Sequence, residues 1–309
     1  MGCGTEGTSL PEPALTLQSA SMKQLFLAWD SCFGATKYNV KISHDGNRFE
    51  AVPGCQGLSQ QLATIDLSVH LTDWQNGQLM VEVQSESGNL RIPYAPLQLT
   101  QSMSAEATGY LKASNPDMGD HFGQALALSA DGKTLAVGAF LEASNATGIN
   151  SDQADNSLSG AGAVYVFVQA DGQWSQQAYL MASNTGAGDG FGSYLALSAD
   201  GNTLAVSALS EASNASGING DQSDNSAYRT GAVYLFQRSG ATWQQQAYVK
   251  ASNPAGNDYF GCDVALSADG NTMAVGASGE DSNAPGIGGD EHNDLASGSG
   301  AVYIFVRSG

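Results

Sequence analysis

The sequence is poor in positive charge, and this shortage excludes whole classes of partner. It has 11 Lys and Arg residues against 30 Asp and Glu residues, which gives a formal net charge of −19. Such a chain repels nucleic acid and anionic membranes and attracts cations. No apolar run approaches the roughly 20 residues that a membrane-spanning helix needs. We therefore expect no nucleic-acid partner and no transmembrane helix.

Signatures of common catalytic sites are also missing. The sequence contains no G-x-S-x-G, H-E-x-x-H or Cys-x-x-Cys motif and no phosphate-binding loop. Its four histidines occupy unrelated positions, namely His44, His70, His121 and His292. We therefore expect a protein that is not an enzyme and has no catalytic residues. Because acids are abundant, paired carboxylates acting on a polysaccharide stay open as an alternative.

What the chain has instead is repetition. Three stretches are near copies at a fixed offset of 69 residues. The markers in register are Phe122, Phe191 and Phe260 of the Phe-Gly pairs, Asp131, Asp200 and Asp269 of Ser-Ala-Asp-Gly, and Ala163, Ala232 and Ala301 of Ala-Val-Tyr. Repeats of this kind bury their apolar faces by stacking on their neighbours.

Each repeat is expected to contain four strands. In the middle copy the strand-like runs are 194–198, 203–208, 232–237 and 243–251, rich in Val, Leu, Tyr, Phe and Trp. Tight Asp-Gly and Ser-Gly turns join them in hairpins, so each repeat reads as an antiparallel meander. The fold class is therefore all-β, with the repeats as blades of a β-propeller at about 110–178, 179–247 and 248–309.

These motifs resemble a known family. A Phe-Gly pair, two apolar strands and a later Gly-Ala-Val-Tyr strand are similar to the FG-GAP repeat of integrin α-subunit propellers and related bacterial surface proteins, across residues 107–309. The resemblance implies a propeller, often with bound calcium, that serves adhesion or ligand binding. Integrin propellers hold their calcium in an Asp-x-Asp-x-Asp-Gly hairpin, which is Ser-Ala-Asp-Gly here, so those ligands do not carry over by position.

Three blades are fewer than the four to eight of an ordinary propeller. Residues 108–114 match the fourth strand of a repeat, whereas the last repeat stops after its third strand. The early strand could therefore complete a blade at the other end. We favour a piece of a longer array, with a homo-oligomer that closes a ring as the second interpretation.

The first hundred residues lack the repeat. They divide into a tether at 1–12, a sandwich domain at 13–100 and a linker at 101–107, ahead of the propeller repeats at 108–309. Strands are predicted at 24–29, 36–43 and 79–84. Trp29 and Tyr38 fall on adjacent strands, and this region resembles a fibronectin type III domain, in which such residues fill the core between two sheets.

The four cysteines give limited information. Cys32 and Cys55 either form a disulfide or stay as free thiols, because spacing alone does not separate these alternatives. Cys262 has no cysteine counterpart in the other repeats, so we expect a packed thiol. Cys3, in Met-Gly-Cys-Gly, looks like the end of a bacterial lipoprotein signal, with an incidental cysteine as the alternative. We expect an extracellular or cell-surface location, with an outer-membrane lipoprotein included.

A long polar loop joins the second and third strands of each repeat. Structureless loops beyond about 12–15 residues are usually functional or disordered. The loops repeat hard oxygen donors at Glu142, Asn145, Asp152, Asp155 and Asn156, at Glu211, Asn214, Asp221, Asp224 and Asn225, and at Glu280, Asn283, Asp290, Asn293 and Asp294. Calcium prefers six to eight such ligands, so we predict a Ca²⁺ site in each loop. The alternative is that these side chains only form Asx-turns.

The topology predicts a binding face. In a meander the connection from strand two to three and the connection to the next blade emerge at the same end, and both are long and acidic here. Residues that differ between repeats, namely Tyr228, Arg229, His292 and Leu295, fall on this long-loop face. We therefore predict a calcium-stabilised module for adhesion or for protein or glycan recognition. A polysaccharide enzyme and a purely structural spacer are the alternatives.

Overall fold

The structure is a computed structural model of the chain and describes residues 109–170 and 173–307 of the C-terminal part. In the N-terminal part it describes 15–21, 24–29, 35–43, 48–52, 55–60, 62–66, 78–85, 91–93 and 97–98. The chain divides into two compact units, Met1–Leu111 and Lys112–Gly309. All elements in these stretches are β-strands, and none of the described residues forms a helix long and apolar enough to cross a membrane. The predicted all-β fold class is confirmed.

The N-terminal unit contains two antiparallel sheets. The first has the order β1 (Leu15–Ser21), β2 (Gln24–Trp29) and β5 (Leu62–Asp66). The second has the order β4 (Glu50–Ala51), β3 (Ala35–Ser43), β6 (Gln78–Ser85) and β7 (Arg91–Pro93), with β8 (Leu97–Gln98) also paired to β6. The rings of Trp29 and Tyr38, one from each sheet, are buried with their centroids 5.6 Å apart. The sheets therefore pack face to face as a sandwich, as predicted.

The structure describes two of the cysteines, Cys55 and Cys262. Cys55 is a buried free thiol whose Sγ lies 3.5 Å from the carbonyl oxygen of Thr64, and burial raises its pKa. Cys262 is a partly exposed free thiol. Cys3, Cys32 and the predicted linker at 101–107 lie outside the described residues. Of the two alternatives for Cys55, the free thiol is the one observed.

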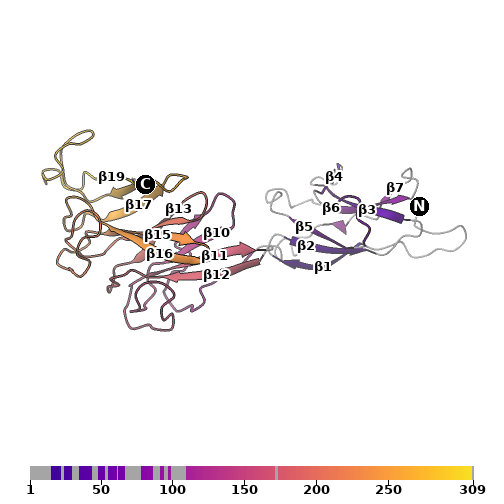
Figure 1. The fold of residues 1–309 in the computed structure, drawn as a ribbon, viewed down its shortest axis with the longest axis horizontal. Coiled ribbons are helices and arrows are strands. Elements are labelled where there is room, and N and C mark those ends of the chain that lie inside the picture. The colour runs from indigo at the N-terminus through magenta and orange to yellow at the C-terminus, as the bar shows by residue number, and fades with distance from the viewer. Residues whose placement is uncertain are drawn as a thin grey trace, which may run out of the picture. The chain divides into compact units, whose positions relative to one another are not determined.

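The C-terminal unit contains three antiparallel sheets, which we call blades 1, 2 and 3 (Figure 1). Blade 1 consists of β9 (Ala125–Leu128), β10 (Thr134–Ala139), β11 (Ala163–Ala170) and β12 (Gln173–Leu180). Blade 2 consists of β13 (Phe191–Leu197), β14 (Thr203–Ala208), β15 (Ala232–Ser239) and β16 (Thr242–Val249). Blade 3 consists of β17 (Phe260–Leu266), β18 (Thr272–Ala277) and β19 (Ala301–Val306). The strands follow one another in chain order, so each blade is the predicted meander.

The Ser-Ala-Asp-Gly hairpins explain why the first two strands of each blade turn so tightly. In blade 2, Asp200 Oδ1 accepts hydrogen bonds from Ser198 Oγ at 2.6 Å and from the backbone N–H of Asn202 at 3.0 Å. Gly201 then takes a positive φ of 70°. The hydrogen bonds hold the pKa of the Asp200 carboxyl below its usual range. The equivalent aspartates of blades 1 and 3 make the same contacts.

The Phe-Gly pairs hold neighbouring blades together. Phe191 of blade 2 is fully buried, with its ring edge-on to Tyr234 at 5.3 Å, and it joins Val164 and Leu180 of blade 1 in one core. A Cβ placed on Gly192 would lie 2.7 Å from the carbonyl oxygen of Ala163, so only glycine allows the backbones of the two blades to approach this closely. Blades 2 and 3 share a second core of the same kind.

One expected strand is not formed. The sequence matches 108–114 to the fourth strand of a blade, yet residues 109–114 contain no strand. Tyr110 is 83% exposed, whereas its counterparts Tyr179 and Tyr248 are fully buried. Among the described residues no strand pairs with this segment, so its backbone lacks the hydrogen-bond ladder that a strand requires.

Candidate functional site

The long loops and the connections between blades meet at one end of the sheets, as the topology predicted. In each blade an asparagine from the connection reaches a glutamate of the long loop. Asn115 Nδ2 donates to Glu142 Oε1 at 3.1 Å, Asn184 to Glu211 at 3.1 Å and Asn253 to Glu280 at 3.2 Å. This end of the unit is the long-loop face.

A buried Tyr–Asn–Glu network fixes each loop. Glu142 and Glu211 are fully buried and Glu280 is 3% exposed. In blade 2, Tyr234 Oη donates to Asn184 Oδ1 at 2.6 Å, and Glu211 Oε2 accepts the backbone N–H of Ser213 at 3.2 Å. Blades 1 and 3 repeat both contacts. Because buried polar groups that are hydrogen-bonded are costly to disturb, this network gives a loop without an apolar core a defined shape.

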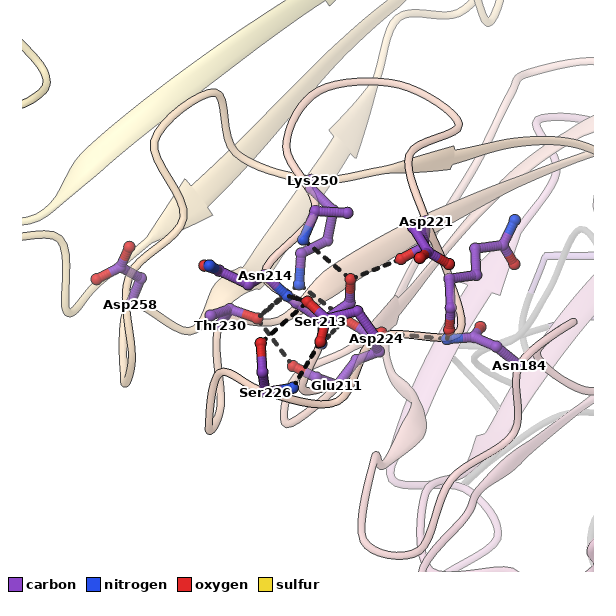
Figure 2. A network of polar contacts seen from close by, with 12 residues as sticks. Asn184, Glu211, Ser213, Asn214, Asp221, Asp224, Ser226, Thr230, Lys250 and Asp258 are labelled. Atoms are coloured by element: carbon purple, nitrogen blue, oxygen red, sulfur yellow. Dashed lines mark hydrogen bonds and ion pairs between the residues drawn. The ribbon is translucent and has the colours of Figure 1, made fainter.

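Blade 2 adds a buried cation to its network (Figure 2). Lys250 Nζ lies 2.7 Å from Glu211 Oε2, and the two side chains are 1% and 0% exposed. Lys250 Nζ also donates to Thr230 Oγ1 at 2.5 Å, and that hydroxyl donates to the carbonyl oxygen of Ser213 at 2.8 Å. Burial lowers the pKa of Lys250, while Glu211 opposes that shift. The ion pair is fully removed from solvent.

Blade 1 has no such cation at this position. Met181 and Ala161 stand where blade 2 has Lys250 and Thr230, and both are buried. Glu142 is held only by neutral donors, and burial raises its pKa. The same loop shape is therefore reached with and without an ion pair.

The predicted calcium ligands separate into two groups. The glutamates point into the networks, whereas the Asp and Asn residues form turns on the exposed loop. Asp155 accepts the backbone N–H groups of Asn145 and Ser157, each at 2.9 Å, and Asp152 accepts that of Ala154. Asp221, Asp224, Asp290 and Asn293 accept equivalent backbone N–H groups, and Asn156 donates to Asp117.

In these turns, hydrogen bonds occupy the carboxylate oxygens that a calcium ion would need as ligands. Hydrogen bonds from Ser157, Ser223 and Ser226 lower the pKa values of Asp155, Asp221 and Asp224, in that order. Within the stretches that the structure describes, no three Asp, Glu, His or Cys side chains are grouped so as to hold a metal ion. The arrangement therefore does not fit a preassembled carboxylate cage, and the Asx-turn alternative accounts for the contacts. Calcium binding stays a prediction from the sequence.

Each blade has a second buried acid, and the one in blade 2, Asp189, differs from its counterparts in its hydrogen bonding. Asp189 is 4% exposed, and its Oδ2 has no hydrogen-bond partner in the structure. Burial, with Glu211 nearby, raises the pKa of Asp189 to about 7. The counterparts Asp120 and Asp258 each accept a backbone N–H, at 2.8 and 2.7 Å.

A partly exposed cluster of two tyrosines and an arginine lies where blades 2 and 3 meet on the long-loop face. The guanidinium carbon of Arg229 is 4.6 Å from the ring centroid of Tyr228 and 5.9 Å from that of Tyr259. Arg229 Nη1 also donates to Tyr259 Oη at 3.0 Å. Tyr228 is 61% exposed. We call these three residues the Tyr–Arg–Tyr cluster.

The backbone at this cluster is strained. Arg229 and Tyr259 have φ values of 56° and 54°, in the left-handed region that favours glycine. The counterparts of Arg229 are Gly160 and Gly298, and the middle counterpart of Tyr259 is Gly190. Arg229 thus occupies a position where both other repeats have glycine, whereas the left-handed backbone of Tyr259 also occurs at its blade 1 counterpart His121, with a φ of 57°.

The sequence predicted part of this site. Tyr228 and Arg229 were expected on the long-loop face, and Leu295 and His292 are indeed exposed there, Leu295 at 76%. Lys250, Tyr259 and the network asparagines were not expected to matter. The asparagines could have been found, since Asn115, Asn184 and Asn253 recur in register after Ala-Ser.

Comparison with known proteins places the repeats in a family. Residues 174–236 and 243–305 each match the family model described as the FG-GAP repeat. No curated protein sequence matches the chain. The C-terminal unit is therefore a β-propeller-type repeat unit. It contains FG-GAP repeats, as its Phe-Gly and Gly-Ala-Val-Tyr motifs indicated.

Solved structures give weaker likenesses. The chicken interferon gamma receptor alpha chain is 10% identical over 79% of this chain and 100% of its own, with a TM-score of 0.24. The Dos1 propeller is 10% identical over 84% of this chain and 65% of its own, with a TM-score of 0.26. The FN1–FN3 domains of chicken CNTN1 are 8% identical over 78% and 100%, with a TM-score of 0.22. At these TM-scores the fold assignment rests on the sheets themselves.

Proposed function

We propose that the C-terminal unit is a non-enzymatic recognition module of the adhesion type, which binds its partner on the long-loop face around the Tyr–Arg–Tyr cluster. The observation that carries the proposal is the strained backbone of Arg229, which stands where both other repeats have glycine. A non-glycine residue in the left-handed region costs stability and persists where function needs it. At this strained position the guanidinium of Arg229 contacts the rings of Tyr228 and Tyr259.

The chemistry of the cluster suggests the class of ligand. Arg229 is a cation on the acidic long-loop face of a chain with a net charge of −19. A guanidinium binds a carboxylate through two parallel hydrogen bonds, and a tyrosine ring offers a flat apolar surface for a sugar or an aromatic side chain. Tyrosine and arginine are also enriched among the residues that dominate binding energy. We therefore infer a glycan or a protein segment that carries a carboxylate.

The buried networks support this surface. Glu211 and Thr230 fix the loop that carries Tyr228 and Arg229, because Thr230 directly follows Arg229 and is only 1% exposed. A site on loops gains precision when its supporting residues are locked by hydrogen bonds. The cluster is thus presented by a shaped loop.

The alternatives gain no support from a specific observation. Asp189, the carboxyl group whose pKa lies near neutrality, is 4% exposed, so a polysaccharide cannot reach it as an acid catalyst needs. From the sequence alone we also propose a cell-surface or secreted location, with anchoring through a lipidated Cys3. Calcium is not required by the proposal.

Binding to short carboxylated probes tests the proposal. We would immobilise galacturonic-acid oligomers, their methyl esters, glutamate-rich peptides and their glutamine counterparts, and measure binding of the full chain at physiological ionic strength. Short probes limit repulsion from the acidic chain, since charges beyond about 8 Å are screened there. We expect binding to at least one carboxylated probe and none to its neutral counterpart. Equal binding to both forms, or turnover of a probe, would contradict the proposal.

A further inference from the structure

The turn that carries Arg229 has the same backbone shape in all three blades but not the same residue. Arg229 has a φ of 56°, and its counterparts Gly160 and Gly298 have φ values of 68° and 65°. Glycine adopts this left-handed conformation at no steric cost, whereas a residue with a Cβ atom loses stability there. Blade 2 therefore holds Arg229 in a conformation that an arginine ordinarily avoids.

The backbone contacts with the next blade do not explain this difference. In blades 1 and 2 alike, three N–H groups of the following connection donate to three consecutive carbonyl oxygens of the turn, at 2.9–3.2 Å. The donors to the blade 2 turn are Asn257, Tyr259 and Phe260, and the donors to the blade 1 turn are Gly188, Gly190 and Phe191. The same hydrogen bonds thus hold a turn with glycine and a turn with arginine.

The residue after Arg229 is fixed from the opposite side. Thr230 is 1% exposed, and its hydroxyl lies 2.8 Å from the carbonyl oxygen of Ser213 and 3.1 Å from that of Glu211. Lys250 Nζ donates to the same hydroxyl at 2.5 Å. Thr230 is therefore a buried, hydrogen-bonded anchor that directly adjoins Arg229.

Lys250 joins the two ends of the long loop (Figure 2). Its Nζ lies 2.7 Å from Glu211 Oε2 at the start of the loop and 2.5 Å from Thr230 Oγ1 at its end. An ammonium group has three N–H donors and no acceptor. Because the ion pair is removed from solvent, moving Thr230 away would leave one of these donors without a partner and without water. The ammonium therefore opposes any movement of the turn.

Blade 1 shows the same turn without this anchor. Ala161 replaces Thr230 and Met181 replaces Lys250, so at these two positions blade 1 offers neither a hydroxyl nor an ammonium. The backbone N–H of Met181 still donates to Gly148 at 2.8 Å, as that of Lys250 donates to its counterpart Gly217. The change from glycine to arginine thus coincides with two buried changes beside the turn.

We propose that Lys250 and Thr230 are positioning residues for the recognition surface, which hold the turn in its left-handed form and so keep Arg229 against Tyr228 and Tyr259. For its effect on binding this inference rests on the proposed function, whereas its effect on stability needs no ligand. Without the buried hydrogen bonds the turn relaxes toward a conformation that suits arginine, and the guanidinium leaves the two rings. Only the fraction of molecules with the left-handed turn then binds, so the affinity falls in proportion.

A double-mutant cycle on stability tests the positioning role without any ligand. In the wild-type background, Arg229→Gly removes the strain and should raise the melting temperature. In a Thr230→Ala background the turn has already relaxed, so Arg229→Gly should give a smaller gain. An equal or larger gain in Thr230→Ala would overturn the proposal, because the contacts of the Tyr–Arg–Tyr cluster itself would then hold the turn.

Blade 3 supplies the matched controls. Thr230→Ser keeps a hydroxyl, as in Ser299, whose hydroxyl contacts the carbonyl oxygens of Glu280 and Ser282. Ser299→Ala makes the same deletion next to Gly298, in a turn without arginine. In both backgrounds Arg229→Gly should give the wild-type gain in melting temperature. A reduced gain in either control would assign the effect to general destabilisation and overturn the proposal.

Binding provides the second measurement. At a temperature where each variant is folded, we would measure affinity for the galacturonic-acid oligomer or glutamate-rich peptide that binds the wild-type chain best. Thr230→Ala should weaken binding at least about tenfold, which is the size of one hydrogen bond to a charged group, while Thr230→Ser and Ser299→Ala should keep the wild-type affinity. Full affinity in Thr230→Ala would overturn the positioning role. A wild-type chain that binds none of the probes would contradict the proposed function alone, since the stability cycle still decides the positioning role.

Lys250 is tested together with Thr230. Lys250→Met breaks the same hydrogen bond as Thr230→Ala, so it should also weaken binding at least about tenfold. Adding Thr230→Ala to Lys250→Met should weaken binding no further. A further loss in the double variant would show that the two residues act separately and would overturn their joint role. If Lys250→Met does not fold, the Thr230→Ala cycle and its two controls decide the proposal.

Discussion

Blades 1 and 2 hold the same buried glutamate in two different ways. Glu142 is surrounded by neutral groups, with Met181 and Ala161 nearby, whereas Glu211 meets Lys250 and Thr230. The hydrogen bonds from the asparagine and from the serine backbone are the same in both blades. The comparison teaches that the Tyr–Asn–Glu network shapes the loop, and that the ion pair is an addition specific to blade 2.

The largest expected effect comes from making blade 2 resemble blade 1. Lys250→Met leaves Glu211 buried without its cation, and breaking a buried pair in this way costs about 3–5 kcal/mol. Urea unfolding of the C-terminal transition at pH 7 measures the loss. Adding Glu211→Gln should recover a large part of it, because the uncompensated charge is gone. A loss below about 1 kcal/mol for Lys250→Met would show that blade 2 tolerates the neutral arrangement as readily as blade 1.

Asp189 provides a pH-dependent comparison. Its folded pKa of about 7 lies above the ordinary 3.8, so the folded state binds the proton more tightly than the unfolded state. Stability from this group is fully present below about pH 4 and is lost as the pH rises to about 7, by at most about 4 kcal/mol. We expect Asp189→Asn to flatten the decline of the melting temperature between about pH 4.5 and 7.5.

The control for this pH profile has the opposite sign. Hydrogen bonds lower the pKa of Asp200, so its contribution is present above the unfolded pKa and is lost as the pH falls. Asp200→Asn should therefore leave the decline toward neutral pH in place. An Asp189→Asn variant with the wild-type profile would contradict the assigned role of Asp189.

The exposed turns should give a smaller effect. Asp221 and Asp224 accept backbone N–H groups, so replacing both with Ala should lower the melting temperature, by less than Lys250→Met does. Because turns need no metal, we expect the same loss in millimolar calcium and in EDTA. A wild-type midpoint that calcium raises, by up to about 2.7 kcal/mol at 100 times the dissociation constant, and that the double variant loses, would confirm the sequence-based calcium prediction instead.

The sequence predicted the strands well because their signal is periodic. The predicted run 203–208 matches β14, and the run 24–29 matches β2. Because the repeats are offset by 69 residues, strands predicted in one blade also predict those of the other blades. Inside the loops no period indicates which side chains point inward. Asp and Asn suit both calcium and Asx-turns, so the pattern alone could not show that Glu211 lies inside the network while Asp224 caps a turn.

Side-chain contacts between segments that are distant in the sequence could not be predicted either. Lys250 follows β16 by one residue and Thr230 lies 20 residues upstream, so their contact depends on how the loop folds back on the strand. Tyr259 joins Arg229 only because blades 2 and 3 are neighbours. Such contacts between irregular segments leave no local signal in one sequence.

The smallest expected change in stability tests the central claim most directly. Arg229→Gly gives blade 2 the glycine that Gly160 and Gly298 provide in the other repeats, which relieves the positive φ of 56°. We would measure the melting temperature and the affinity for the best carboxylated probe on the same sample, with Lys133→Gly as the control. The recognition account predicts an unchanged or higher melting temperature and at least a tenfold loss of affinity. Full affinity in Arg229→Gly would contradict it.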